Sequence, residues 1–427
     1  MKAARVRQHV VLVMLVAALF VWAPCYGAEI DLGTAYMPDE LEKVRQWEKT
    51  WVGKRITREN VEQVADFFPT AYVGMIKNPE KWGAPAEGFY FTIVPYKRYT
   101  ATRGMREATQ KYASMVAKPG PDGTIANYGD IAGRPFPKPQ NGLEIAYNID
   151  FNNHGDASRY RRYCPNINPK SKSERLSDQE YVEYYWMHRT EVEPRPVYPE
   201  NKKGYRRGMF THMFKPAEFL NTRMYTVRYI DQTKDDDTYM WYAQFRRIRR
   251  LSTSQRTDSI DGSDLIYDDE YLWDGQILRN NYTFTGKKDL LSSRHQDMKK
   301  TERISGQAMV NGLTFERCNT LVVEAVNKDP SYIYSKRVWY IDPESYLILW
   351  EDVYDEAGRF WKSFMNNTCP LPTKQGDEKM FIVGTCFPDF MRTHSGLSNQ
   401  QHFYEPEISS DAISPKMFTI SSLQKTY

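Results

Sequence analysis

The sequence lacks the short patterns that mark common catalytic and cofactor sites. It contains no G-x-S-x-G, H-E-x-x-H or G-x-G-x-x-G pattern and no P-loop. Two histidines, His188 and His212, each stand alone among aromatic residues, which predicts structural rather than catalytic roles. We therefore predict a protein that is not an enzyme and that needs no cofactor.

Cysteine is scarce, with five residues in a chain of 427. None belongs to a C-x-x-C pair or has a histidine at ligand spacing, so no zinc site is predicted. In an oxidising compartment the four cysteines beyond residue 27 would form one or two disulfides, with three full pairings open. We favour a local Cys369–Cys386 bridge across a segment rich in proline and glycine. The four candidates are Cys164, Cys318, Cys369 and Cys386.

Long apolar runs are also rare, and the one that stands out lies at the amino terminus. Residues 10–22 are uncharged and apolar, follow three basic residues, and are followed by Pro24 and then small residues. This order is typical of a cleaved secretory signal peptide, which we place at residues 1–27. The run is short for a span of about 30 Å of hydrocarbon, so an uncleaved anchor is the weaker alternative. Lipid attachment at Cys25 is a third reading, which the preceding proline disfavours.

Neither sign of charge dominates the chain. Its formal charge is +4, and the predicted signal peptide holds three basic and no acidic residues, so the mature chain is close to +1. A nearly neutral chain lacks the basic footprint of a nucleic-acid-binding protein. Aromatic residues, by contrast, make up 14% of the sequence, although the mean hydropathy is −0.67. Such a chain can bury a core and still present amphipathic rings to a groove.

The distribution of turns and apolar residues divides the mature chain near residue 205. Residues 28–205 read as helices over 38–69 and 99–116, a strand over 88–96, a Pro/Gly-rich connection over 131–142, and long loops over 155–205 with a short helix near 179–188. Residues 206–427 read as short strands joined by turns, which predicts an antiparallel meander. The expected strands are 208–214, 222–230, 238–251, 278–285, 303–309, 313–326, 331–341, 346–354 and 358–365.

One predicted strand carries the candidate binding residues. Tyr239, Trp241 and Phe245 share one face of it, and these aromatics would line a groove or belong to an ordinary core. Arg247 and Arg249 share a face further along, where they would form an anion-binding rim. The competing interpretation, which we favour for the arginines of 246–250, is pairing with the acidic residues of 261–269. The run Asp235–Asp237 is interpreted as a solvated turn rather than a calcium site.

Three segments resemble known families of exported bacterial proteins. Residues 246–271 (RRIRRLSTSQRTDSIDGSDLIYDDEY) and 334–362 (YSKRVWYIDPESYLILWEDVYDEAGRFWK) resemble periplasmic proteins related to the lipoprotein carriers of the Lol pathway. Residues 131–149 (IAGRPFPKPQNGLEIAYNI) resemble the Pro-Phe-Pro…Gly motif of the DUF1329 family. The DUF1329 pattern covers nearly the whole mature chain, and the Lol-like part covers its second half.

The resemblance implies a mainly β (α+β) fold, in which a curved antiparallel sheet forms an unclosed half-barrel with helices over its concave face. It implies a periplasmic carrier for lipids, lipoproteins or other apolar ligands, because a half-barrel of this kind hides acyl chains from water. Residues 28–205 would pack on the barrel formed by 206–427. An envelope transporter or outer-membrane protein is the partner implied. The alternative is a non-transporting accessory subunit of an envelope complex, with a filled barrel and an exposed apolar patch.

Overall fold

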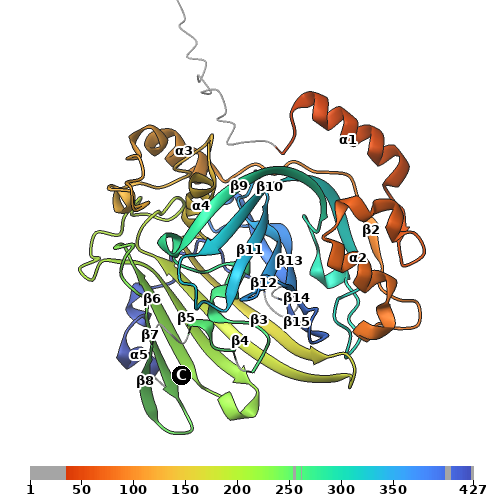
Figure 1. The fold of residues 1–427 in the computed structure, drawn as a ribbon. Helices are drawn as coiled ribbons and strands as arrows, with labels where there is room; N and C mark the ends of the chain where they lie inside the picture. The colour runs from red at the N-terminus through yellow and green to blue at the C-terminus, as the bar shows by residue number, and fades with distance from the viewer. Residues whose placement is uncertain (1–34, 253–255, 261, 400–404, 425–427) are drawn as a thin grey trace, which may run out of the picture. The chain divides into compact units, whose positions relative to one another are not determined.

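Strands dominate the structure and pair into one large sheet (Figure 1). The computed structural model describes residues 35–252, 256–260, 262–399 and 405–424; the predicted signal peptide and Cys25 lie outside them. The first strands are β1 (Arg55–Ile56), β2 (Phe91–Ile93), β3 (Ala157–Asn168), β4 (Ser173–Tyr185), β5 (Tyr205–Lys215), β6 (Arg223–Tyr229), β7 (Asp237–Tyr242) and β8 (Arg247–Leu251). The others are β9 (Asn280–Ser292), β10 (Leu313–Asn327), β11 (Tyr334–Ile341), β12 (Ile348–Asp355), β13 (Phe360–Pro372), β14 (Glu378–Asp389) and β15 (His394–Asn399).

Two antiparallel meanders make up most of this sheet. One runs from β9 to β15 and the other from β3 to β8, and β15 pairs with β3 to join them. The join is sparse, with the residue pairs Ser395–Ile167, Gly396–Asn166 and Asn399–Tyr163. The short β2 lies parallel to β10, which departs from the expected all-antiparallel arrangement. Strand β8 ends the order at the other side, so the sheet is curved but unclosed, as predicted.

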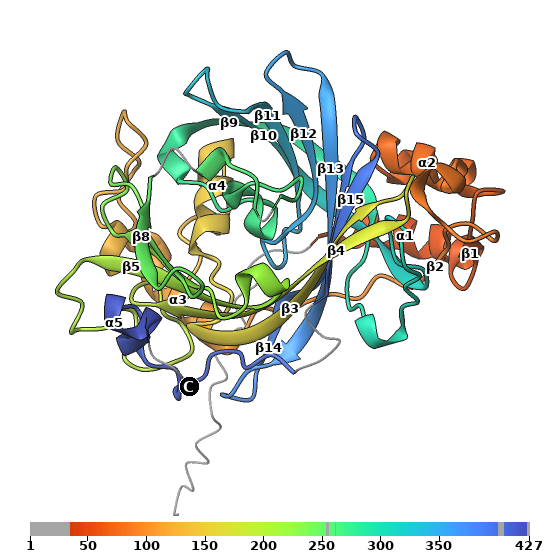
Figure 2. The ribbon, with the colours of Figure 1, turned by 90° about the horizontal axis from the view of Figure 1, so that it is seen from below.

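The two faces of the curved sheet are covered by different segments. The helices are α1 (Pro38–Trp51), α2 (Thr70–Lys77), α3 (Arg103–Tyr112), α4 (Gly142–Phe151) and α5 (Ile420–Leu423). Helix α4 and the segment 256–279, of which all residues except 261 are described, lie between the two arms of the sheet, against its concave face (Figure 2). Helices α2 and α5 pack on the outer face, α2 near β12–β13 and α5 near β6–β7. The chain within the described residues offers no helix that is both long and apolar enough to cross a membrane.

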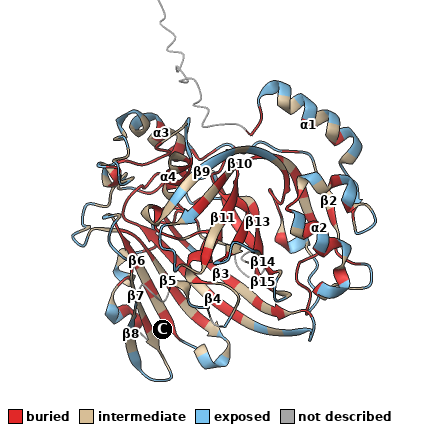
Figure 3. Ribbon diagram, in the orientation of Figure 1, coloured by how far each residue is buried: buried red, intermediate tan, exposed pale blue. Residues whose placement is uncertain are grey.

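Most strands of both meanders are largely buried, whereas β8 and most of β9 are exposed or partly exposed (Figure 3). On the concave side, apolar residues of α4 such as Ile145 and Phe151 pack with Trp273 of the 256–279 segment and with Trp339 and Phe364 of the strands. A second cluster on the outer face of β3–β7 is completed by the carboxyl-terminal segment of the chain. The two clusters draw on different strands, the concave one on β10–β14 and the outer one mainly on β3–β6.

Several elements differ from the sequence-based expectation. Residues 155–205 were expected to be loops with a helix near 179–188, but they form the long strands β3 and β4. Residues 238–251 form two strands with a turn between them, and 303–309 is not a strand. β14 and β15 were not anticipated. Because β4 pairs with β5, the sheet continues through residue 205, and residues 32–427 form one compact unit.

Ion pairs explain why β3 and β4 resemble loops in the sequence. Arg161 pairs with Asp178 across the two strands, with Nε to Oδ1 at 2.7 Å. Arg162 is only 7% exposed and forms a bidentate pair with Glu270 of the segment inside the concave face. Charged residues therefore occupy inward-facing strand positions that are usually apolar. The alternation of apolar and polar residues that marks a strand is lost for this reason.

Candidate functional site

The concave face of the sheet, where the resemblance places the ligand, is occupied by the chain itself. Val323, Trp339 and Phe364 of the strands are fully buried beneath α4 and the 256–279 segment. Two cavities described on this side have volumes of about 50 Å³ each. A volume of this size holds a few water molecules and not an acyl chain. The expected open groove on the concave face is therefore filled.

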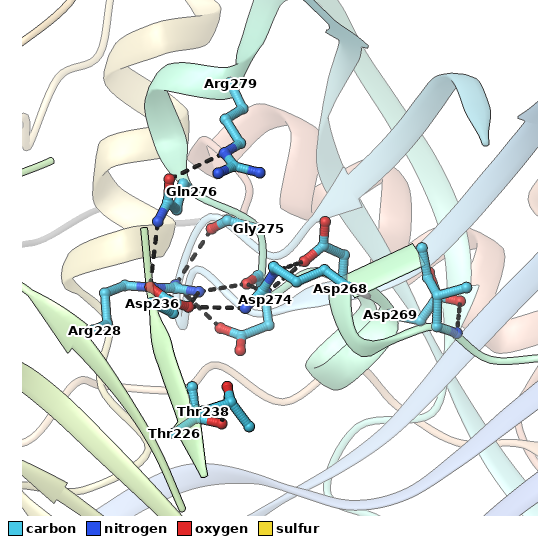
Figure 4. A network of polar contacts seen from close by, with 12 residues as sticks. Thr226, Arg228, Asp236, Thr238, Asp268, Asp269, Asp274, Gly275, Gln276 and Arg279 are labelled. Carbon is cyan, nitrogen blue, oxygen red and sulfur yellow. Dashed lines mark hydrogen bonds and ion pairs between the residues drawn. The ribbon is translucent and has the colours of Figure 1, made fainter. Parts of the chain in front are cut away.

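Buried ion pairs hold the 256–279 segment against the sheet (Figure 4). Arg228 of β6 bonds to Asp236 (Nη2 to Oδ2, 2.8 Å) and to the backbone oxygen of Asp274 (2.7 Å). Arg256 bonds to Asp236 (2.8 Å) and to Asp268 (2.5 Å). Burial alone would raise the pKa of Asp236, but the guanidinium groups of Arg228 and Arg256 hold it well below its ordinary value. Asp236 therefore stays ionised between Arg228 and Arg256, and the contacts of these arginines with Asp268 and Asp274 attach the segment to the sheet.

This network corrects two predictions about charged residues. Asp236, interpreted as part of a solvated turn, is only 6% exposed and lies at the centre of the network. Asp261 lies outside the described residues. Asp264, Asp268 and Asp269 pair with Arg392, Arg256 and Arg337, so the prediction that these three carboxylates pair with the arginines of 246–250 is wrong.

The predicted groove aromatics lie on the opposite face from the one expected. Tyr239 pairs with Tyr225 at a ring-centroid distance of 5.3 Å, and both belong to the outer-face core. Trp241 lies beside Arg223, whose Nη1 donates to the backbone oxygen of Leu423 in α5. These aromatics are therefore core residues of the outer face. Alternation predicts which residues share a face, but it does not tell which face is concave.

The remaining predicted residues of this hairpin are exposed. Phe245 lies in the turn between β7 and β8 and is 68% exposed, so it does not line a groove with Tyr239 and Trp241. Arg247 and Arg249 lie on β8, at the end of the sheet order, with exposed side chains. Arg249 has its guanidinium 5.8 Å from the ring centroid of Tyr242. The two arginines do not border any of the cavities described here.

The favoured disulfide is incompatible with the strand register. Cys369 of β13 lies opposite Phe381, whereas Cys386 of β14 lies opposite Met365. The two cysteines are thus offset by four residues along β13, about 13 Å, and a disulfide needs Cα atoms within roughly 7 Å. Cys318 and Cys386 are buried thiols, Cys369 is a half-buried one, and Cys164 is a half-buried residue of β3. Burial raises the pKa of Cys386 to about 12, which keeps its thiol protonated.

A larger cavity, which we call the outer-face cavity, lies where the two meanders join. Cys386 in its lining lies beside Tyr72 of α2, so the cavity is on the outer face of the sheet. Its volume is about 350 Å³, within the range of small-molecule sites. β13, β14, β15 and β3 form one wall, and residues 296–311, which we call the covering segment, form the other. Its lining is apolar with a few polar groups: Tyr163, Pro165, Met298, Thr301, Arg303, Met309, Val310, Met365, Asn367, Thr385, Cys386, Leu397, Ser398 and Asn399.

The covering segment is held on the sheet by polar contacts at its middle and its end. Glu174 of β4 pairs with Arg303 and accepts a hydrogen bond from the backbone N–H of Gly306 (2.6 Å). The backbone oxygen of Ala308 accepts from Ser395 Oγ (2.8 Å). Although burial alone would raise it, the bonds from Arg303 and Gly306 hold the pKa of Glu174 below its ordinary value. The segment is thus attached through a few local contacts, in contrast to the ion-pair network of the concave side.

Asn367 brings a buried polar atom to this cavity that has no hydrogen-bond partner among the described residues. Asn367 is 2% exposed, and its Oδ1 accepts no hydrogen bond from the residues described. Strand alternation places Asn367 on the same face as Met365, and it lies opposite Gly384 on β14. A Cβ at Gly384 would be 2.9 Å from Met298 Cε, so glycine lets Met298 approach the sheet there. The cavity therefore combines adaptable methionine side chains with one buried acceptor.

Sequence reasoning missed this cavity. Its covering segment was taken for a strand over 303–309, and β14 and β15, which form much of its wall, were not anticipated. The methionines at positions 298, 309 and 365 were the available signal, because flexible thioether side chains often line binding surfaces.

The family of proteins of unknown function DUF1329 matches residues 55–424 of this sequence. The chain belongs to the DUF1329 family. The uncharacterized protein PA3922 of Pseudomonas aeruginosa is 24% identical over 324 residues, covering 72% of this chain and 67% of that protein.

Solved structures of low identity resemble this DUF1329 chain. A DUF1329 protein of Desulfovibrio piger is 16% identical, with a TM-score of 0.48, covering 66% of this chain and 98% of that one. A proposed outer membrane lipoprotein-sorting protein domain of Vibrio parahaemolyticus has the same identity and coverage and a TM-score of 0.47. The LolA superfamily protein NE2245 of Nitrosomonas europaea is 14% identical, with a TM-score of 0.36, covering 65% and 96%.

Proposed function

We propose that this DUF1329 protein is an exported binding protein or carrier for a small apolar ligand, which it holds in the outer-face cavity. The observation that carries the proposal is the cavity of about 350 Å³ between the covering segment and β13–β15. A cavity of about 150 Å³ holds a benzene ring, so this one suits a single chain or a small ring system. Several acyl chains of a lipoprotein would not fit in it, which narrows the ligand class suggested by the resemblance.

The physical chemistry of the lining supports this proposal. Met298, Met309, Val310 and Leu397 offer an apolar surface, and each CH₂ group removed from water contributes about 0.8 kcal/mol to binding. Binding of this kind needs no catalytic residue. A periplasmic location with release to an envelope transporter or outer-membrane protein is the setting proposed for the ligand exchange.

Binding of a fluorescent apolar probe, 1-aminoanthracene, tests the proposal. Replacement of Met309 by tryptophan fills the cavity, and we expect the dissociation constant to rise at least tenfold. Met309 is 2% exposed and Met115 is 59% exposed, so Met115→Trp is the matched control and should bind as the unmodified protein does. Equal binding by the two variants, each with an unchanged melting temperature, would contradict the proposed site. Native mass spectrometry of gently purified protein should in addition reveal a bound apolar molecule.

The filled concave face favours the alternative function, a non-transporting accessory subunit of an envelope complex. That alternative also requires an exposed apolar patch for a partner. The large exposed apolar side chains lie on separate elements, for example Met37 before α1, Phe245 in the β7–β8 turn and Phe284 on β9. Failure of the probe to bind, together with specific capture of an envelope protein, would favour the alternative.

A further inference from the structure

Asn367 defines the chemistry that a ligand of the outer-face cavity must carry. We propose that the cavity selects an amphiphile with one hydrogen-bond donor, a hydroxyl or an amide N–H, which it places on Asn367 Oδ1. This inference rests on the proposed function and names the ligand class of that same site. A purely apolar molecule of the same size would leave the carbonyl oxygen without a partner.

The buried, unpartnered atom of Asn367 is a carbonyl oxygen, which calls for a hydrogen-bond donor on the ligand. The exposure of Asn367 is 2%, so bulk water does not reach the side chain freely. Across the ladder lies Gly384, which has no side chain of its own to bond the amide. A second lining residue, Ser398, also has an unpartnered buried oxygen, but strand alternation places its side chain with that of Thr385, which donates to Asn366. Asn367 is thus the orphan acceptor on the cavity side.

Two other polar residues of the lining, Arg303 and Cys386, are already engaged. Arg303 is paired with Glu174, and the thiol of Cys386 donates to the backbone oxygen of Ala308 (3.2 Å). An anionic headgroup would have to compete with Glu174 for Arg303. A neutral donor requires no such exchange, because it satisfies Asn367 without breaking an existing contact. The preferred ligand is therefore an uncharged amphiphile, such as an alcohol or an amide with an apolar tail.

A matched pair of probes tests this inference on the unmodified protein. 1-Decanol and 1-methoxynonane have equal numbers of heavy atoms, and only the alcohol has a donor. Displacement of 1-aminoanthracene should give decanol the lower dissociation constant by about tenfold, the effect of leaving a buried acceptor unpaired. Equal affinities for the two probes would overturn the inference and leave the proposed function intact. If neither probe binds, both fail.

A variant of Asn367 tests whether its Oδ1 atom causes the preference for decanol over 1-methoxynonane. Asn367→Leu removes the acceptor at nearly constant volume, and we expect it to bind the two probes equally, mainly by weakening decanol binding. Asn281→Leu, the same change at an exposed strand position, is the control and should keep the tenfold preference. A tenfold preference that persists in a folded Asn367→Leu variant would overturn the assignment. If that variant does not fold, the comparison of probes on the unmodified protein still decides the ligand class.

Discussion

The two faces of the sheet differ in what fills them. On the concave face, α4 and the 256–279 segment occupy the space, and buried ion pairs such as Arg228–Asp236 hold them there. On the outer face, the covering segment spans β13–β15 and leaves a cavity of about 350 Å³. A curved sheet therefore does not by itself define a ligand groove. Which face can bind depends on where the chain returns and how firmly it is attached.

The largest expected effect comes from breaking the network on the concave face. Arg228→Met would leave the carboxylates of Asp236 and Asp274 buried with one guanidinium fewer to balance their charge. Removal of one partner from a buried ion pair lowers the free energy of unfolding by about 3–5 kcal/mol. Urea unfolding should show this loss. Arg250 pairs with Asp237 but is exposed, so Arg250→Met is the matched control and should leave the unfolding midpoint nearly unchanged. Equal losses in the two variants would mean that the network does not hold the interior.

Trp241 tests whether an outer-face aromatic outside the cavity has any role in binding. Trp241→Ala removes a half-buried ring from the core beneath α5, and we expect a loss of about 2–3 kcal/mol in the free energy of unfolding. Binding of 1-aminoanthracene at a temperature well below the melting transition should be unchanged. A selective loss of binding without a loss of stability would restore Trp241 as a ligand-binding residue.

The ionisation of Glu351, on the concave side, makes the free energy of unfolding depend on pH. Burial raises its pKa to about 7, although Arg337 and Trp339 donate hydrogen bonds to it. A carboxyl group with a raised folded-state pKa contributes stability that is present at low pH and is lost as the pH rises through that pKa. The free energy of unfolding should therefore fall by about 1 kcal/mol from pH 6 to pH 8. In Glu351→Gln this part of the pH dependence should disappear.

The smallest effect is kinetic and concerns the covering segment. Glu174→Gln weakens the attachment of this segment through Arg303 and Gly306, so release of 1-aminoanthracene, measured by stopped flow, should become several-fold faster. Because the pKa of Glu174 is lowered, its contribution is present above its unfolded-state pKa and is lost as the pH falls through the folded-state value. Acid should therefore accelerate release in the unmodified protein and have less effect in the variant.

Local pattern was sufficient for much of the fold. The helix beginning at Pro38 and most strands after residue 205 follow from this pattern and are confirmed, and the unclosed curved sheet, which the family resemblance implies, is confirmed as well. The strands β3 and β4 were missed because residues such as Arg162 and Glu183 are buried in their interior-facing positions. Charge compensation by distant segments, here by Glu270, is not visible in a local window of sequence.

The candidate site could not be predicted in the same way. Alternation grouped Tyr239 with Trp241, but it carries no information on which face of the sheet is concave. The cavity joins β3 with β15, more than 200 residues apart in the chain, and its buried acceptor, Asn367, has no distinguishing neighbours in the sequence. Only the tertiary arrangement reveals that the acceptor is buried and unpartnered.

The central claim is that ligand binds on the outer face and not within the concave side. A crystal structure of the protein with 10-bromodecan-1-ol tests it directly, because the anomalous signal of bromine locates the ligand. We expect bromine between the covering segment and β13–β15, with the hydroxyl at Asn367. Bromine among α4, Trp273 and Trp339 on the concave side would contradict it.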